Sequence, residues 1–118
     1  MRVYLSGFMT GYPNWNYPAF HAAAAALRQR GFEVTNPAEI ISDPNEPWAI
    51  LMRKALWFLL GAGAVVLLPG WERSKGANLE LAVASQLELI VYRWPDLAQI
   101  EFDTGIVNIR KVGECLAK

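Results

Sequence analysis

The feature that most constrains this fold is an apolar run followed by a glycine-bearing turn and a helix. The run is Ala64–Leu68, Pro69–Gly70 closes it, and Ser74–Gly76 opens an apolar helical stretch. A short apolar run between turn residues is typical of a buried strand. The free N–H groups at the start of the next helix can bind an anion. We therefore expect a strand–turn–helix unit with an anion site at its turn.

Strands and helices alternate along most of the chain. Strands are expected near residues 3–5, 32–35, 64–68 and 89–92, and helices near 17–30, from 48 onward and near 74–87. Such alternation is typical of a parallel sheet with helices on both faces. We predict a single α/β domain over residues 1–118, with a Rossmann-like (flavodoxin-like) parallel sheet of four to five strands. Its core is expected at about 1–92, and a C-terminal extension at 93–118 is expected to hold a short helix and a strand.

Charge and hydrophobicity narrow the class of partner. The net charge is zero, with 11 basic and 11 acidic residues, whereas nucleic-acid-binding domains carry a basic excess. We therefore expect no polymeric nucleic acid. The uncharged run 55–71 is interrupted by Gly61 and Gly63, so we interpret it as helix, turn and strand rather than as a membrane span. Hydrophobic residues make up 53% of the chain, a surplus that favours a homo-oligomer, either a dimer or a larger assembly.

The chain contains one cysteine and one histidine. Cys115 has no partner for a disulfide within the chain, which is typical of a reducing compartment and predicts a cytoplasmic protein. Cys115 has no histidine close to it in sequence and is expected to be inert, and His21 is expected on a helix surface. One histidine and one cysteine do not suffice for a structural zinc site, so we expect no metal.

Two glycine-bearing loops, 6–16 and 69–77, follow the first and third expected strands. Ligands bind such sheets at the carboxyl ends of the strands, which makes these loops the candidate site. Neither loop contains the P-loop pattern or the dinucleotide fingerprint, and no acidic residue closes the second strand, so we expect no cofactor. Trp15, Trp71 and Trp94 fall in expected loops, where they line a ligand site or a subunit interface, or form buried lids.

The third expected helix holds two candidates for chemistry: the set Ser74, Lys75 and Gly76 at its start, and Glu80. Ser74 can cap the helix and can give a hydroxyl to a phosphate. Glu80 lies about one turn inside the helix, between Leu79 and Leu81. A buried carboxylate is costly unless it is hydrogen-bonded or used in a reaction. The residues alone leave open whether Glu80 is reactive, structurally paired or on the surface.

Three motifs together carry a family resemblance. They are Tyr4–Gly11, Asn36–Glu39, and Leu67–Glu72 with Ser74, Gly76 and Leu79–Leu81. In combination they resemble the nucleoside 2-deoxyribosyltransferase-like family, in particular its short phage and bacterial members, over roughly residues 3 to 92. The related 2'-deoxynucleoside 5'-phosphate N-hydrolases are similar in having a serine six residues before the glutamate.

The resemblance implies a site for a nucleoside or nucleotide. Glu80 would attack C1' of a deoxyribose and expel the base, and water or a second base would resolve the glycosyl-enzyme. Ser74 would hold the 5'-phosphate, and the loop from Ser6 to Tyr12 would contact sugar and base. The expected binding residues are Ser6, Gly7, Met9, Thr10, Gly11, Trp71, Ser74, Gly76 and Asn78.

One departure from the family divides the hypotheses. Ala55 stands where the family has an aspartate that assists the sugar and the departing base, and Gly63 stands where another aspartate is often found. Asp43 or Glu46 is a candidate substitute. The first hypothesis is an N-glycosidase or deoxyribosyltransferase. The second is a nucleotide-binding protein of the same fold that senses or sequesters its ligand without turnover. The third is a structural role, with the Trp-rich loops forming an interface.

Overall fold

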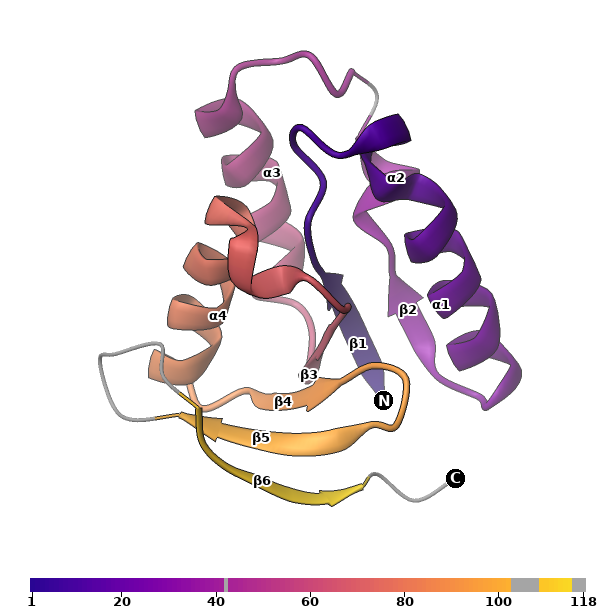
Figure 1. The fold of residues 1–118 in the computed structure, drawn as a ribbon, viewed down its shortest axis with the longest axis vertical. Coiled ribbons are helices and arrows are strands. Elements are labelled where there is room, and N and C mark those ends of the chain that lie inside the picture. Colours follow the sequence, from indigo (N-terminus) through magenta and orange to yellow (C-terminus); the bar gives the residue numbers. More distant parts are fainter. Residues whose placement is uncertain (42, 103–108, 116–118) are drawn as a thin grey trace.

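The centre of the fold is a largely parallel sheet. A computed structural model describes residues 1–41, 43–102 and 109–115. Its strands are β1 (Arg2–Ser6), β2 (Glu33–Thr35), β3 (Ala64–Leu67), β4 (Ile90–Arg93), β5 (Ala98–Phe102) and β6 (Ile109–Cys115). Within the described ranges they form one six-stranded sheet in the order β2-β1-β3-β4-β5-β6. The pairs among β1 to β4 are parallel, whereas β5 and β6 add antiparallel pairs (Figure 1).

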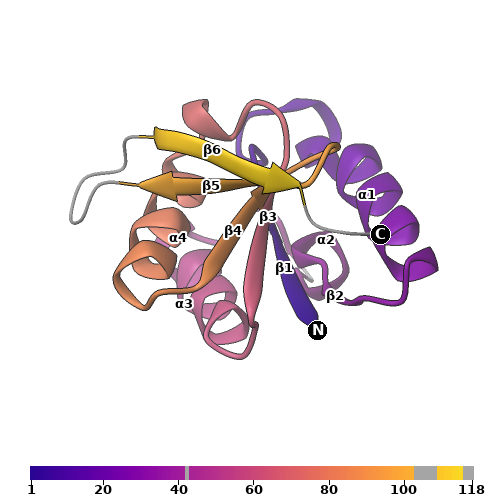
Figure 2. The same cartoon turned by 90° about the horizontal axis from the view of Figure 1, so that it is seen from below.

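Helices cover both faces of this sheet. They are α1 (Tyr17–Gln29), α2 (Pro37–Ile40), α3 (Trp48–Leu59) and α4 (Lys75–Gln86), with 3-10 turns at η1 (Pro13–Asn16) and η2 (Trp71–Arg73). Figure 2 shows α1 and α2 on one side of the twisted sheet and α3 and α4 on the other. No helix in the described part of the chain is both long enough and apolar enough to span a bilayer.

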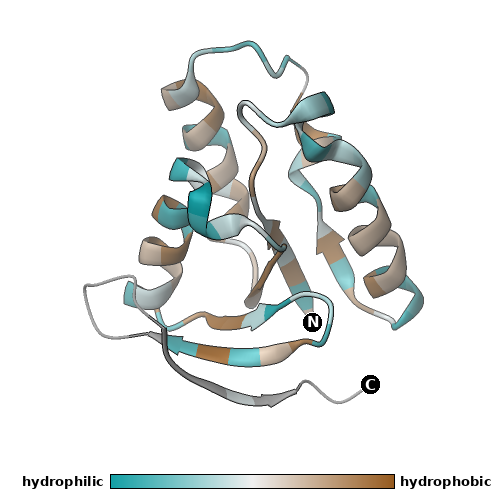
Figure 3. Ribbon diagram, in the orientation of Figure 1, coloured by the Kyte–Doolittle hydropathy of each residue, from teal (hydrophilic) through white to brown (hydrophobic). Residues whose placement is uncertain are grey.

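The alternation of side chains along β1 creates two cores. Val3 and Leu5 pack with α1, whereas Tyr4 faces the opposite side and packs with residues of α3 and α4. This is the period of two expected of a strand. Strand β3 is buried along its whole length, and apolar residues concentrate in the central strands and the helices (Figure 3). A sheet that is covered on both faces accounts for the continuous apolar run of β3.

The structure confirms the predicted fold class, with the four expected strands and three expected helices. It differs at two places. We expected Asn36–Pro37 only to end β2, but the Asn36 side chain accepts a hydrogen bond from the Ala38 N–H at 3.0 Å and so starts the short helix α2. The expected short helix of the extension is absent from its described residues, which form β5 and β6. The side chain of Cys115 lies outside the described residues.

Candidate active site

The candidate site lies at the carboxyl ends of β1 and β3. These strands are parallel neighbours, with Ser6 paired to Leu67, so the loops that follow them meet at one edge of the sheet (Figure 1). Gly7 allows the close approach, because an added Cβ would lie 3.0 Å from the Leu68 Cβ. The sheet therefore brings together the two loops that the sequence singles out.

Glu80 reaches this edge from the first turns of α4. Ser74 is the N-cap, and its Oγ accepts a hydrogen bond from the Ala77 N–H at 3.0 Å. The Asn78 side-chain amide donates to the carbonyls of Glu72 and Ser74 at 3.0 and 2.8 Å. Both contacts fix the start of the helix, and Glu80 is only 5% exposed. A surface position, one of the alternatives that the sequence leaves open for Glu80, is therefore excluded.

Two hydroxyl groups of β1 hold the Glu80 carboxyl. The Tyr4 hydroxyl donates to Oε2 of Glu80, and the Ser6 Oγ donates to Oε1 at 2.8 Å. Tyr4 and Ser6 are two residues apart on one strand, so their side chains lie on the same face. Both are fully or almost fully buried, at 0% and 1% exposure. We call these three residues the Glu80 cluster.

Burial controls the protonation of the Glu80 cluster. Desolvation raises the pKa of the Glu80 carboxyl from its usual 4.5 to about 7, and the hydrogen bonds from Tyr4 and Ser6 offset part of that rise. Desolvation, together with the neighbouring Glu80 charge, raises the pKa of Tyr4 well above its usual value. Tyr4 therefore stays a hydrogen-bond donor at neutral pH, whereas Glu80 is divided between acid and carboxylate.

Glu80 and Tyr4 line a cavity of about 250 Å³. The rest of its lining is mostly apolar and comes from the β1 loop, α1, α2, α3 and the start of α4. Four aromatic side chains, which we call the aromatic wall, are Trp15, Tyr17, Phe20 and Trp48. A mostly apolar cavity with a few placed polar groups is the usual form of a small-molecule site.

Two basic side chains also line this cavity. The Lys75 Nζ lies 4.0 Å from the centroid of the Trp48 ring, and the Arg73 guanidinium carbon lies 5.4 Å from the Phe8 ring centroid. Such cation–π contacts orient a cation without neutralising it. Within the described ranges neither cation forms an ion pair with a carboxylate. The cavity therefore combines an acidic group at Glu80 with two uncompensated positive charges.

The structure places six of the ten expected site residues in the cavity lining: Gly7, Met9, Thr10, Ser74, Gly76 and Glu80. Gly76 permits close packing there, because an added Cβ would lie 3.0 Å from the Met52 Sδ. Ser6 belongs to the site through its hydrogen bond to Glu80.

Three expected site residues lie elsewhere. Gly11 is in an exposed turn with a φ of +85°. Trp71 is 8% exposed and packs in the hydrophobic core formed by residues of α3, α4 and the sheet. The Asn78 side-chain amide donates to the backbone carbonyls of Glu72 and Ser74. These positions result from a local turn, core packing and hydrogen bonds to the backbone, and the lining of the cavity does not include them.

Sequence reasoning placed Lys75 in the candidate set with Ser74 and Gly76 but gave it no role, and it did not assign Tyr4, Tyr17 or Arg73 to the site. Tyr4 had a usable signal, since hydroxyl side chains two residues apart on a buried strand share one face. Arg73 and Lys75 fall inside the loop that was singled out, on either side of Ser74. Tyr17 had no such signal, because only the folded loop turns the first residue of α1 toward the cavity.

The acidic residues in the loop before α3 do not supply a carboxylate to the cavity near Ala55. Ala55 lines the cavity, but Asp43 and Glu46 do not. The Asp43 Oδ1 accepts a hydrogen bond from the Asn45 N–H at 2.9 Å, and Glu46 pairs with Lys54 at 2.7 Å. Among the residues that the structure describes, Glu80 is the one carboxylate in the lining. In this arrangement neither of the two candidate substitutes, Asp43 and Glu46, lies in the lining of the cavity.

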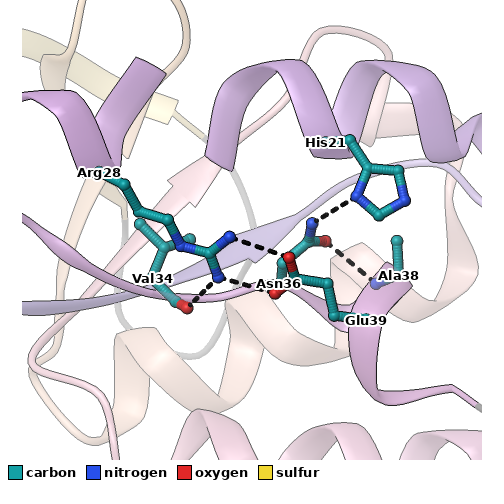
Figure 4. Close-up of polar contacts among 6 residues, drawn as sticks. All are labelled: His21, Arg28, Val34, Asn36, Ala38 and Glu39. Carbon is teal, nitrogen blue, oxygen red and sulfur yellow. Dashed lines mark hydrogen bonds and ion pairs between the residues drawn. The ribbon is translucent and has the colours of Figure 1, made fainter. Parts of the chain in front are cut away.

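A polar brace supports the α2 side of the cavity (Figure 4). Arg28 donates to both oxygens of Glu39, at 2.9 and 2.7 Å, which ties α1 to α2. The buried Asn36 side chain lies 3.3 Å from His21 Nδ1 while it caps α2. His21 itself is exposed, as expected. The brace fixes the position of Pro37, which lines the cavity.

Comparison with known proteins identifies the family. The chain belongs to the family described as a domain of unknown function (DUF4406), whose profile matches residues 1–93. That family is grouped in the nucleoside 2-deoxyribosyltransferase-like clan, which agrees with the broader part of the resemblance. No curated protein and no solved structure matches the chain.

Proposed function

We propose that this DUF4406 protein cleaves the N-glycosidic bond of a deoxynucleoside 5'-monophosphate, with Glu80 as the nucleophile. The observation that carries the proposal is the Glu80 cluster. It is a buried carboxyl group, hydrogen-bonded by Tyr4 and Ser6, that lines a largely apolar cavity. A buried carboxyl group has a desolvation cost, and a role in covalent catalysis accounts for its retention at the ligand site.

In the proposed reaction a Glu80 oxygen attacks C1' of the deoxyribose. The C1'–N bond breaks, and the base leaves with the bonding electrons and takes a proton from water. Tyr4 and Ser6 hold both carboxyl oxygens, so the attacking group is oriented before substrate binds. The positive charge that develops at C1' is stabilised by the carboxylate. Water, or a second base, then attacks C1' and releases Glu80, which gives hydrolysis or transfer.

The two cations favour a nucleotide over a nucleoside. Arg73 and Lys75 flank Ser74, whose Oγ accepts from the Ala77 N–H and keeps its own proton to donate. The negative charge of a phosphate group near Ser74 would be attracted by these two cations. The N-terminal end of the α4 dipole would also stabilise this negative charge. The aromatic wall supplies faces on which a base can stack. The ligand in this proposal spans the cavity from the phosphate near Ser74 to the sugar beside Glu80.

The direct test is to incubate the protein with each deoxynucleoside 5'-monophosphate and to measure free base. We expect release with at least one of them, and loss of that release in Glu80→Ala. No release with any nucleotide, or equal release by the Glu80→Ala protein, would contradict the proposal.

A second function is favoured by Ala55. The side chain of this cavity residue ends in a methyl group, so no acid at this position protonates the departing base. General acid–base assistance is worth about 10²–10⁴-fold, and without it the protein can act as a nucleotide sensor or sequestering protein. This function predicts that nucleotides raise the melting temperature and are recovered unchanged. Consumption of the bound nucleotide during the incubation would exclude it.

The homo-oligomer stays a prediction that the exposed end of α3 supports. Trp57 is 72% exposed, and Leu60, next to the helix, is 59% exposed. Large apolar side chains on a surface often mark a subunit contact. Light scattering of the full chain is expected to give a dimer or a larger species. A clean monomer at working concentrations would contradict this expectation.

A further inference from the structure

The hydroxyl of Tyr17 is buried without a hydrogen-bond partner. Tyr17 is the first residue of α1, and its side chain lines the same cavity as Glu80. Among the residues that the structure describes, its oxygen is the one buried side-chain nitrogen or oxygen atom that lacks a partner. An unpaired buried hydroxyl destabilises a folded protein. Such a group inside a ligand cavity is explained when the ligand supplies the missing acceptor.

Contacts other than its hydroxyl hold the Tyr17 ring in place. The ring centroid lies 6.0 Å from that of Trp15 and 6.1 Å from that of His21. The three residues before it, Asn14, Trp15 and Asn16, all have left-handed φ values of 51° to 59°. Such values are uncommon outside glycine, and strain of this kind gathers at ligand sites. The strained backbone at residues 14–16 therefore positions the side chains of Trp15 and Tyr17 in the cavity lining.

We propose that the Tyr17 hydroxyl donates a hydrogen bond to the base of the bound nucleotide. This inference rests on the proposed function, because it takes the ligand to be a nucleotide. Tyr17 and Trp15 form the part of the aromatic wall near the start of α1, where we place the base. The cations that attract phosphate flank the start of α4, where Lys75 contacts Trp48 at the other part of the wall. Ring nitrogens and carbonyl oxygens of the bases are acceptors. Tyr17 thus supplies a polar contact in a lining where Ala55 supplies none.

The role assigned to Tyr17 is binding rather than proton transfer. Burial raises its pKa above the usual value, so the phenol keeps its proton at neutral pH. A donor of this kind binds an acceptor of the base without giving up its proton. Its loss is therefore expected to raise KM and the dissociation constant.

The test is Tyr17→Phe, which removes only the hydroxyl. We expect the dissociation constant for the preferred deoxynucleoside 5'-monophosphate to rise about 3- to 10-fold, the loss of one neutral hydrogen bond. Binding of 2-deoxyribose 5-phosphate, which lacks the base, is expected to stay unchanged. The melting temperature of the ligand-free variant is expected to equal or exceed that of wild type, because a buried unpaired group is removed.

Tyr12→Phe is the matched control, since Tyr12 is exposed on the same loop and does not line the cavity. It is expected to leave all three measurements unchanged. Equal nucleotide affinity in Tyr17→Phe and wild type would overturn the inference. A lower melting temperature of ligand-free Tyr17→Phe would also overturn it, because the hydroxyl would then be paired within the chain. Wild type that binds nucleotide without releasing base overturns the proposed cleavage alone, and wild type that binds no nucleotide overturns both.

Discussion

The Glu80 cluster and the rest of the cavity lining are built in opposite ways. In the cluster, each polar group is buried and the carboxyl is hydrogen-bonded at both oxygens. In the aromatic wall and along α3, the lining is mostly apolar, and Ala55 and Met52 line the cavity there. In the proposed reaction, chemistry therefore depends on one carboxyl group. The rest of the lining would bind the nucleotide and exclude water, and it supplies no carboxyl group for proton transfer. The following experiments test this division.

Loss of the carboxylate is expected to have the largest effect. Glu80→Gln keeps the shape of the side chain and a carbonyl oxygen for a β1 hydroxyl, but removes the nucleophile. We expect base release to fall at least about 10³-fold, with nucleotide binding retained in a thermal-shift assay. Retained turnover in this variant would show that another group attacks the sugar.

The buried carboxyl is also expected to make stability depend on pH. Its pKa in the folded protein, about 7, lies above its usual 4.5, so the folded state binds the proton more tightly. The stability from this group is therefore complete below about pH 4.5 and is lost as the pH rises through about 7. The free energy of unfolding should fall by about 3 kcal/mol over that window.

Thermal unfolding of wild type and Glu80→Gln between about pH 5 and 8 measures this dependence. The wild-type melting temperature is expected to fall with pH, and the variant is expected to lose most of that fall. Glu39 and Asp96 have lowered pKa values and act in the opposite direction, but at more acidic pH. Parallel curves for the two proteins would contradict the buried-acid assignment.

A carboxyl group introduced at position 55 of α3 is expected to increase turnover. Ala55→Asp places an acid in the lining, where it can protonate the departing base. We expect base release to rise about 10²-fold, with some loss of stability because a polar group is buried. Ala55→Asn is the control of similar size that lacks the acid. If both variants fold and release base at the wild-type rate, the absence of an acid at position 55 does not limit the rate of base release.

The smallest expected effect is a shift of the pH–rate profile in Tyr4→Phe. The Tyr4 hydrogen bond lowers the Glu80 pKa against the effect of burial, so its removal raises that pKa further. The reaction requires ionised Glu80, and the rise of rate with pH should therefore move to higher pH than in wild type. An unchanged or more acidic profile would show that Tyr4 does not control the charge of Glu80.

The sequence predicts the sheet, and the end of the sheet where the candidate site lies, better than it predicts the contacts at that site. The apolar run of β3 and the Ser74 cap specify local structure, and parallel pairing then places the loops after β1 and β3 together. Tyr17 and Ala55 reach the cavity from helices far apart in the chain, and no local pattern reveals which way they face. Gly11, Trp71 and Asn78 were expected at the site because they lie in the right motifs. A turn at Gly11, core packing of Trp71 and hydrogen bonds from Asn78 to backbone carbonyls determine their positions instead.

The sequence pattern predicted one strand in the C-terminal extension, but it did not predict the antiparallel pair β5–β6. Strand β5 follows a short turn after β4 and pairs with it antiparallel, with Arg93 opposite Ala98. Its sequence, AQIEF, alternates apolar and polar residues over only a few positions. Such alternation indicates a strand, but it does not reveal which strand it pairs with or in which direction.

The most direct test of the central claim is to trap the intermediate on Glu80. Wild type is mixed with the preferred deoxynucleoside 5'-monophosphate, quenched rapidly in acid and digested, and the peptides are analysed by mass spectrometry. The expected result is one deoxyribose 5-phosphate bound to the peptide that contains Glu80, and none in Glu80→Gln. Base release by wild type with no adduct at Glu80 in any quenched sample, or with an adduct on another residue, would contradict the assignment of Glu80 as the nucleophile.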